Sequence, residues 1–313
     1  MSSDLKIFSG GANLQLATHI CETLGIGLSR LAVSRFSNDN LFVQIRENVR
    51  EKDVFVVQSF TAPVGDTIIE LFIILDALRS ASARRITAVI PYFSYARSDK
   101  KDAPRISITG RLMADLIRTA GADRVLTMDL HSDAVHGFFS IPVDHLTAIP
   151  YFVDHFRGQL DLDNAVVVAT DAGGAKRAGR FAKRIHLPMA IIDKRRVADT
   201  EVVQGLVVGE VKGRDAIIFE DEISTGGTLA ASVKTLAVAG VKSIHVGATH
   251  GVLCGPAVNR LVDSPIESVA VTDTVHLPRE KRAEKIHILS VAPLFAEAIR
   301  RIHTGESVGA LFD

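Results

Sequence analysis

A short apolar run that leads into acids and then into a glycine-containing loop constrains the fold more than any other stretch of the chain. Residues 216–228 read AIIFEDEISTGGT. Four apolar residues bounded by turn-forming residues predict a buried parallel strand at 216–219. Residues 229–240 repeat apolar side chains at helical spacing and stop at a glycine, which predicts a helix. The polar loop therefore lies at the carboxyl end of a strand, where open α/β sheets bind ligands.

The residue types of this loop suit a phosphorylated sugar. Two glycines let the backbone approach an anion closely, and helix-start amides together with Ser and Thr hydroxyls donate hydrogen bonds to it. The carboxylates beside them can accept hydrogen bonds from sugar hydroxyls. An ordinary strand-to-helix turn with capping hydroxyls and solvated acids has the same spacing, so spacing alone leaves both interpretations open. The chain contains no G-x-x-x-x-G-K-[ST] pattern, which excludes a Walker P-loop.

The composition is that of a globular protein, and the length is enough for two domains. The 313 residues are 47% hydrophobic and 23% charged, and Lys+Arg and Asp+Glu balance at 36 each. A balanced charge gives no reason to expect nucleic acid or a membrane surface as a partner. The two cysteines lie far apart, the N-terminus lacks the pattern of a signal peptide, and the most apolar helix-like run (68–78) is too short to span a bilayer. We therefore expect a cytoplasmic protein.

The chain contains an internal repeat. Strands alternate with helices in both halves, which predicts parallel sheets flanked by helices. KDVFVV at 52–57 matches RDAIIF at 214–219, but QSFTAP at 58–63 replaces the acids and glycines of the second copy. We expect two copies of one α/β domain, 1–146 and 147–313, joined by a linker near 141–150. The final helix, from about residue 293, packs either on its own domain or back on the first one.

Three further groups of residues are candidates for chemistry. His131 and Asp171 each follow a strand, one in each half, where together they could hold a Mg²⁺ ion with substrate phosphates. A lone histidine is equally open to an acid–base role or a place in the core. Lys194 and Arg196 directly follow a strand, where they form either a solvated basic turn or a lid that neutralises charge on transferred phosphoryl groups. The long polar loop 94–105, which follows a strand, could bind a polyphosphate.

The stretch 216–228 resembles the ribose 5-phosphate loop of the phosphoribosyltransferase fold, and nearly the whole chain resembles the ribose-phosphate pyrophosphokinase family. The matching stretches are 53–59, 89–97, 127–131, 137–145, 171–178, 191–196, 249–258 and 289–311. The resemblance implies two duplicated phosphoribosyltransferase-like domains, with ATP and ribose 5-phosphate meeting at their junction. It also implies transfer of the β,γ-pyrophosphate of ATP to the C1 hydroxyl of ribose 5-phosphate, giving phosphoribosyl pyrophosphate (PRPP) and AMP.

The resemblance further implies a role for each matching position. It implies Lys194 and Arg196 as catalytic residues, and Mg²⁺ bound through His131 and Asp171. The implied ATP-binding residues are Phe36, Asn38, Asp39, Asn40, Arg97, Ser98 and Asp99. The implied ribose 5-phosphate ligands are Arg196, Glu220, Asp221, Ser224, Thr225, Gly226, Gly227 and Thr228. The family also implies a homo-oligomer, with dimers built into hexamers.

Several positions depart from the family's usual pattern. The common Phe-Ser-Asp-Gly-Glu reads FSNDN at 36–40, Ser98 stands where Gln is usual, and KDAPRI at 101–106 replaces an Arg/Ser-rich run. We therefore expect altered regulation by phosphate and ADP, and the nucleotide preference stays open. Two alternatives remain. One is a catalytically silent regulatory subunit, although the Lys194/Arg196 pair and the acids are kept. The other is a phosphoribosyltransferase that consumes PRPP, although that reaction needs no second copy of the fold.

Overall fold

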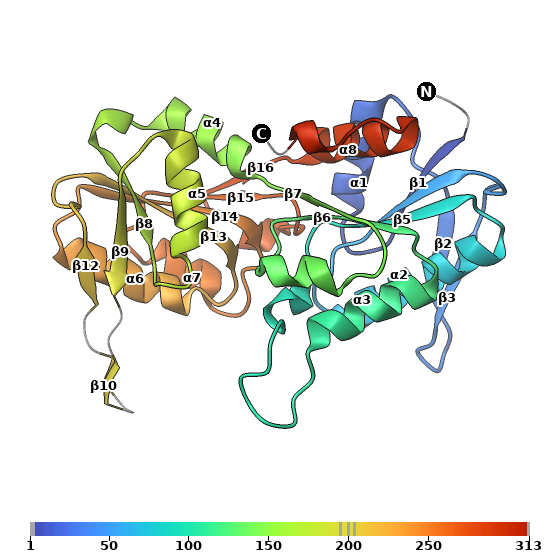
Figure 1. The fold of residues 1–313 in the computed structure, drawn as a ribbon, viewed down its shortest axis with the longest axis horizontal. Coiled ribbons are helices and arrows are strands. Elements are labelled where there is room, and N and C mark those ends of the chain that lie inside the picture. Colours follow the sequence, from blue (N-terminus) through green and yellow to red (C-terminus); the bar gives the residue numbers. More distant parts are fainter. Residues whose placement is uncertain (1–3, 194–195, 199–200, 203–204, 312–313) are drawn as a thin grey trace. The chain divides into compact units, whose positions relative to one another are not determined.

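The computed structural model describes residues 4–193, 196–198, 201–202 and 205–311, and the chain forms two compact units (Figure 1). The first unit contains the described residues up to Thr147, together with Thr274–His276 and the described residues from Ser290 onward. The second unit contains Ala148–Asp273, apart from the gaps just given, and Leu277–Leu289. The chain therefore passes between the units more than once. Each unit is an α/β fold with a mainly parallel sheet, as the sequence predicts.

The first unit is built on a five-stranded parallel sheet with the order β1-β4-β5-β6-β7. Its strands are β1 (Leu5–Ser9), β4 (Asp53–Val57), β5 (Arg85–Ile90), β6 (Arg124–Met128) and β7 (Val143–Leu146). All five residues of β4 are buried, as expected for a strand covered on both faces. A separate antiparallel hairpin, β2 (Leu31–Arg35) and β3 (Leu41–Ile45), projects beside it.

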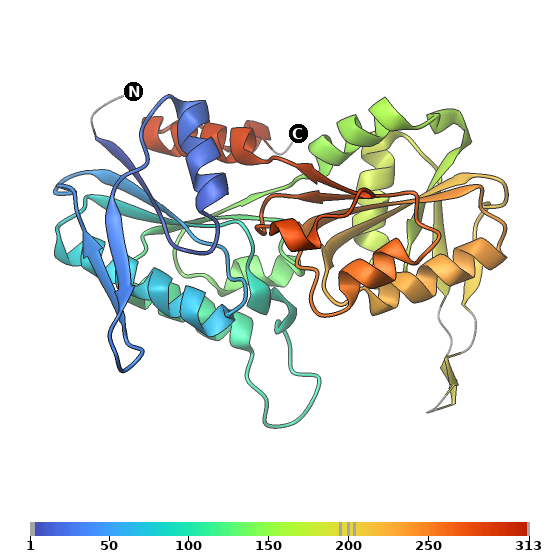
Figure 2. The ribbon, with the colours of Figure 1, turned by 180° about the vertical axis from the view of Figure 1, so that it is seen from behind.

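Helices cover both faces of this sheet. Helices α1 (Leu14–Leu24) and α8 (Ala292–Thr304) pack together on one face, and α2 (Val64–Ser80) and α3 (Thr109–Ala120) lie on the other (Figures 1 and 2). The core between α2, α3 and the sheet is aliphatic and aromatic, with Phe60, Leu71 and Ile117 fully buried. The short 3-10 helices η1 (Ser94–Arg97) and η2 (Asp133–Phe138) follow β5 and β6, and η5 (Gly309–Leu311) follows α8.

A buried ion pair ties α8 to the sheet of the first unit. The carboxylate of Asp53, which has no solvent exposure, accepts hydrogen bonds from Arg85 Nε at 2.8 Å and Nη2 at 2.6 Å. Arg85 also donates to the carbonyl of Ile302 at 2.8 Å, and His303 Nδ1 lies 2.8 Å from Asp53. The end of α8 is therefore held by polar contacts to β4 and β5, although it lies about 250 residues away along the chain.

The second unit is built on a seven-stranded sheet with the order β12-β9-β8-β13-β14-β15-β16. Its strands are β8 (Ala165–Ala169), β9 (Met189–Asp193), β12 (Leu206–Val208), β13 (Asp215–Ile223), β14 (Ser243–Gly251), β15 (Ser268–Thr272) and β16 (Ile286–Leu289). All neighbours are parallel except β12, which runs antiparallel to β9 at the edge. Two short strands, β10 (Arg196–Ala198) and β11 (Glu201–Val202), pair with each other.

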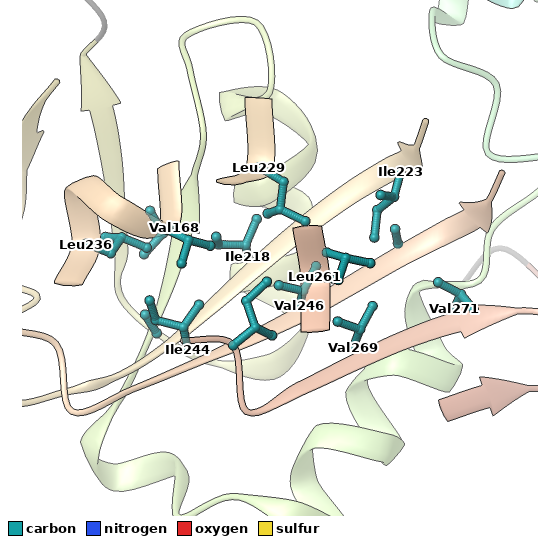
Figure 3. Packing of buried hydrophobic residues seen from close by; sticks show 14 of the residues in the cluster. Val168, Ile218, Ile223, Leu229, Leu236, Ile244, Val246, Leu261, Val269 and Val271 are labelled. Atoms are coloured by element: carbon teal, nitrogen blue, oxygen red, sulfur yellow. The ribbon is translucent and has the colours of Figure 1, made fainter. Parts of the chain in front are cut away.

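The two faces of this sheet bury different sets of side chains. Helices α6 (Gly227–Val238) and α7 (Ala257–Val262) cover one face with an aliphatic core, including Ile218, Val246 and Leu261 (Figure 3). Helices α4 (Ile149–Gln159) and α5 (Ala175–Ile185) cover the other face, where Phe181 stacks on Phe219 with ring centroids 4.5 Å apart. Residues that alternate along β13 therefore face opposite layers. Two short 3-10 helices, η3 (Leu162–Asn164) and η4 (Arg279–Lys281), complete the unit.

Strand β13 is longer than the sequence suggests. The apolar run predicts a strand that ends at Phe219, but β13 continues to Ile223 because β14 pairs with it as far as Gly251. The acids 220–222 therefore lie on the strand and not in the loop. Along the described residues, none of the helices combines the length and the apolar character that crossing a membrane requires.

Candidate active site

The glycine-containing loop 224–228 connects β13 to α6 in the second unit. Gly226 is the residue that precedes the helix, with φ of 71° in the left-handed region that favours glycine. The first intrahelical bond runs from the Ala230 amide to the Gly226 carbonyl at 2.9 Å, and no side chain from the described part of the chain caps the helix. Thr225, Gly227 and Thr228 are exposed. Helix-start amides and two hydroxyl-bearing side chains are thus presented where an anion can bind.

Neighbouring segments hold this loop in place. The amides of Leu253 and Cys254 each donate at 2.9 Å, to the carbonyls of Ile223 and Ser224 respectively. Arg260 on α7 donates from Nη1 to the Thr225 carbonyl at 2.8 Å. Gly227 has no Cβ atom, but a Cβ built on its backbone would lie 3.6 Å from this guanidinium nitrogen. A positive charge therefore lies beside the loop. The sequence did not point to Arg260, because no local pattern connects it to the loop.

One arginine contacts two neighbouring acids of β13. Arg177 Nη1 lies 2.9 Å from Glu220 Oε2 and 3.0 Å from Asp221 Oδ1. The Thr170 hydroxyl donates a short hydrogen bond to Glu220 Oε1. The side chain of Asp221 is only 5% exposed, and those of Glu220 and Arg177 are 18% and 17% exposed. The two carboxylates are therefore held rigidly in a partly dehydrated setting.

Burial raises the pKa of Glu220 above its usual value of 4.5. The Thr170 hydrogen bond and the positive charge of Arg177 oppose this effect, whereas the charges of Asp221 and Asp171 add to it. The net shift is upward, because desolvation by burial is the largest of these effects. Arg177 and Thr170 are site residues that sequence reasoning missed. The sequence places Arg177 within the matching stretch 171–178 but gives it no role.

Asp171 lies in the same region of the second unit, in the turn between β8 and α5. Its Oδ1 accepts a hydrogen bond from the Gly174 amide at 2.8 Å. A Cβ atom built on Gly174 would stand 3.7 Å from Asp171 Oδ1 and 3.9 Å from Glu220 Oε2, so both carboxylates flank this glycine. The structure thus brings together three of the sequence-derived candidates, Asp171, Glu220 and Asp221, beside the start of α5.

His131 lies in the first unit, just after the end of β6, and it is exposed. This exposure excludes the interpretation of His131 as a core residue. The preceding residue is fixed in place, since the Leu130 amide donates to His145 Nε2 at 2.8 Å. Within the described ranges, no group of three or more His, Cys, Asp or Glu side chains is arranged to hold a metal ion. Any ion bound through His131 or Asp171 would need oxygen ligands from elsewhere, such as substrate phosphates.

The candidate ATP-binding residues come from two places in the first unit. Phe36 and 38–40 form the exposed tip of the β2–β3 hairpin, where Arg35 fixes the turn by donating to Asp39 Oδ1 at 2.9 Å. The exposed Phe36 ring packs edge-on against Phe42, with ring centroids 5.6 Å apart. The tip therefore presents an aromatic face and amide side chains to solvent.

Arg97, Ser98 and Asp99 lie at the end of η1, where a long loop begins. The Ser98 hydroxyl accepts from the Thr109 amide at 3.0 Å and lies 3.3 Å from the Ser107 carbonyl, so it closes the base of this loop. Arg97 is exposed. Lys194 falls outside the described residues, and of Arg196 only the backbone, in β10, is described. The two candidate catalytic cations therefore stay predictions.

Comparison with known proteins gives one consistent result. Residues 5–121 match the family model for the N-terminal domain of ribose phosphate pyrophosphokinase, and residues 201–313 match that for the phosphoribosyl synthetase-associated domain. A ribose-phosphate pyrophosphokinase of Deinococcus radiodurans is 52% identical over 314 residues, covering 99% of this chain and 98% of the relative. One from Rhodopirellula baltica is 48% identical over 311 residues, with 99% and 98% covered.

A solved structure agrees with these relatives. The crystal structure of phosphoribosylpyrophosphate synthetase from Mycobacterium smegmatis matches with a TM-score of 0.92 and 39% identity, covering 97% of this chain and 100% of that one. The similarity spans both units, so it includes the degenerate first copy as well as the loop of the second. The chain belongs to the ribose-phosphate pyrophosphokinase family.

Proposed function

We propose that this protein is a ribose-phosphate diphosphokinase that converts ATP and ribose 5-phosphate into PRPP and AMP. The C1 hydroxyl oxygen of the sugar forms a bond to the β-phosphorus of ATP, and the bond from that phosphorus to the oxygen bridging it to the α-phosphate breaks. AMP leaves with the bridging oxygen, and the hydroxyl proton is released. Membership of the family and near-complete coverage of its members support this reaction.

The observation that carries the proposal is the loop 224–228 with the acids beside it. We assign the 5-phosphate of the sugar to the exposed amides and hydroxyls at the start of α6, where the positive charge of Arg260 adds to the attraction. We assign the sugar hydroxyls to Glu220 and Asp221, which Arg177 holds in place. An oriented acceptor pair fixes the sugar so that its C1 hydroxyl is in position to react.

Members of the family use a metal cofactor, and we propose that it is Mg²⁺ in this protein. The oxygen donors of Asp171 fit this ion, and we assign the imidazole of His131 as a second ligand. When bound, Mg²⁺ supplies positive charge to the phosphate oxygens of ATP. Asp171 is already oriented by the Gly174 amide, so its carboxylate needs little rearrangement to bind a cation.

We propose that ATP binds through Phe36 and 38–40 at the hairpin tip and through 97–99 at the loop base. The exposed aromatic ring of Phe36 offers a stacking surface for adenine, and Arg97 offers a cation for phosphate. We propose Lys194 and Arg196 as the cations that stabilise the transferred diphosphate. A cation that contacts those oxygens most strongly when the bond breaks lowers the barrier more than it strengthens ground-state binding.

One assay separates this function from its two alternatives. Pure protein is incubated with ATP, Mg²⁺ and ribose 5-phosphate, and AMP and PRPP are measured. We expect equal amounts of both products, each dependent on the sugar phosphate. A silent regulatory subunit would form neither product, and a phosphoribosyltransferase would instead consume added PRPP with a nucleobase. Either of those results would overturn the proposal.

We also propose a cytoplasmic, homo-oligomeric protein without nucleic-acid or membrane partners. Both cysteines are free thiols, which suits a reducing compartment. The mass of the purified protein, measured by light scattering, tests the oligomer, and a monomer at micromolar concentration would contradict it.

A further inference from the structure

A cavity of about 580 Å³ in the second unit is lined by five basic side chains. Arg157 comes from α4, and Arg180, Lys183 and Arg184 come from α5. His186, which directly follows α5, completes the lining. Each of the five residues is exposed to solvent. A concentration of this kind is unusual in a chain whose positive and negative charges balance at 36 each.

Packing of the two helices creates this cavity. The rings of Phe156 on α4 and Phe181 on α5 meet edge-on, with centroids 6.1 Å apart. Both helices lie on the same face of the sheet (Figures 1 and 2). The buried side of α5 is apolar, with Ala178, Phe181, Ala182 and Ile185. Its opposite side carries three cations at i, i+3 and i+4 spacing, so that they lie on one surface.

Ordinary helix chemistry explains only part of this arrangement. Lys183 and Arg184 in the last turn favour the negative end of the helix dipole. Arg157 Nη2 reaches the Arg184 carbonyl at 3.5 Å. Arg180 lies one turn earlier, where the dipole gives little benefit, and its charge is close to those of Lys183 and Arg184. A multiply charged anion in the cavity could accept hydrogen bonds from all three side chains.

We propose that this cavity is a binding site for a small anion that carries two or more phosphate groups. A volume of about 580 Å³ lies within the range of small-molecule sites. The three guanidinium groups of the lining can each donate two parallel hydrogen bonds to a phosphate. The chain as a whole carries no excess of positive charge, which favours a small polyanion over a nucleic acid.

This site is separate from the loop 224–228. The cavity residues of α5 belong to its middle and last turns, whereas the carboxylate-binding Arg177 belongs to its first turn. A rise of 1.5 Å per residue places Arg180 about 5 Å and Arg184 about 10 Å along the helix from Arg177. The loop itself starts α6, which covers the opposite face of the sheet. A ligand in the cavity would therefore bind in addition to the substrates.

The test uses inorganic tripolyphosphate as the probe and isothermal titration calorimetry of the full-length protein as the measurement. The test variant is Arg180→Gln/Lys183→Gln. A matched control is Lys212→Gln/Lys234→Gln, which removes two exposed positive charges from the same unit outside the cavity. We expect the test variant to lose one binding site per chain, or to bind there at least about tenfold more weakly. The control should bind as the wild type does, and affinity should fall as salt rises.

Turnover with saturating substrates is measured on the same proteins and should be unchanged in both variants. An unchanged turnover distinguishes loss of this site from damage to the proposed substrate site. Thermal melts confirm that both variants are folded. A wild-type isotherm in the test variant overturns the proposal, and so does an equal loss of binding in the control. Tighter binding of a single-stranded RNA homopolymer than of tripolyphosphate, lost in the same test variant, would overturn the assignment to a small anion.

Discussion

Replacing Arg177 by methionine should both destabilise the second unit and impair the proposed sugar site. Arg177 is 17% exposed, and its guanidinium lies 2.9 Å from Glu220 and 3.0 Å from Asp221, which are 18% and 5% exposed. Methionine keeps much of the side-chain volume but removes the charge and the hydrogen bonds. Two neighbouring carboxylates then remain in a partly dehydrated environment without the contacts that Arg177 makes to them. Removing one partner of a buried ion pair costs about 3 kcal/mol.

This cost should depend on pH with a defined sign. Burial already raises the pKa of Glu220 above 4.5, and Arg177 opposes that shift, so the variant should raise this pKa further. A carboxyl whose folded pKa lies above its unfolded value binds a proton more readily in the folded state. The variant therefore recovers stability as the pH falls through the raised pKa. The stability difference from wild type should be largest near pH 8 and smallest near pH 4.5.

Thermal unfolding between pH 4.5 and 8, together with steady-state kinetics, measures these effects. A loss of about 3 kcal/mol corresponds to a Tm decrease on the order of 10 °C at pH 8. The KM for ribose 5-phosphate should rise at least about tenfold, because the acceptor pair is no longer oriented. Arg177→Met/Glu220→Gln should recover part of the Tm but not the KM. The control Arg111→Ala breaks an exposed pair with Asp115 at 3.1 Å and should leave the Tm unchanged.

A Tm decrease that is the same at every pH would refute the electrostatic explanation, since loss of packing alone has no such pH dependence. An unchanged KM in a folded Arg177→Met protein would refute the assignment of Glu220 and Asp221 to the sugar hydroxyls.

Three further predictions concern other residues. Lys194→Ala should lower kcat by a factor of about 10²–10³ with little change in ribose 5-phosphate affinity, whereas Arg196→Ala should also raise the KM for this sugar. Steady-state kinetics measure both, and a wild-type kcat in Lys194→Ala would remove this lysine from the mechanism. Asp171→Ala should raise the Mg²⁺ concentration needed for half-maximal activity, and normal turnover of the folded variant at limiting Mg²⁺ would contradict the metal assignment. Burial lowers the pKa of His155 and of His245 below 6.5. The stability that these neutral side chains contribute is therefore present above pH 6.5 and is lost as the pH falls through their pKa in the folded state. Chemical denaturation between pH 7.5 and 5 measures this loss. A pH-independent unfolding midpoint over that range would contradict this last prediction.

The sequence by itself determined the fold class and the position of the glycine-containing loop 224–228. Continuous apolar runs such as 54–57 and 216–219 predict buried parallel strands, because a strand covered by helices on both faces has no polar side. The glycines at 226–227 and the helical pattern after them place a strand-to-helix loop at the carboxyl edge of the sheet. These signals are local, so they can be read from neighbouring residues alone.

The tertiary structure decided which side chains from distant parts of the sequence contact that loop and the acids before it. Arg177 and Thr170 contact the acids of β13 only because β8 pairs with β13 and α5 packs above them. Arg260 reaches the Thr225 carbonyl from α7, 35 residues further along the chain. The extension of β13 to Ile223 follows from its pairing with β14. No local sequence pattern predicts these contacts, because each depends on the packing of segments that are far apart in the sequence.

For the same reason, the sequence did not predict where α8 packs or which residues line the basic cavity. The polar contacts of His303 with Asp53 and of Arg85 with Ile302 join the end of the chain to the first sheet, and the amphipathic pattern of α8 could not reveal its partner. In the cavity, α5 alone reads as an ordinary basic helix, and Arg157 lies about 20 residues before that cluster. Only the packing of α4 against α5 gathers these charges around one volume, since charge repulsion and anion binding depend on distance in space rather than on order along the chain.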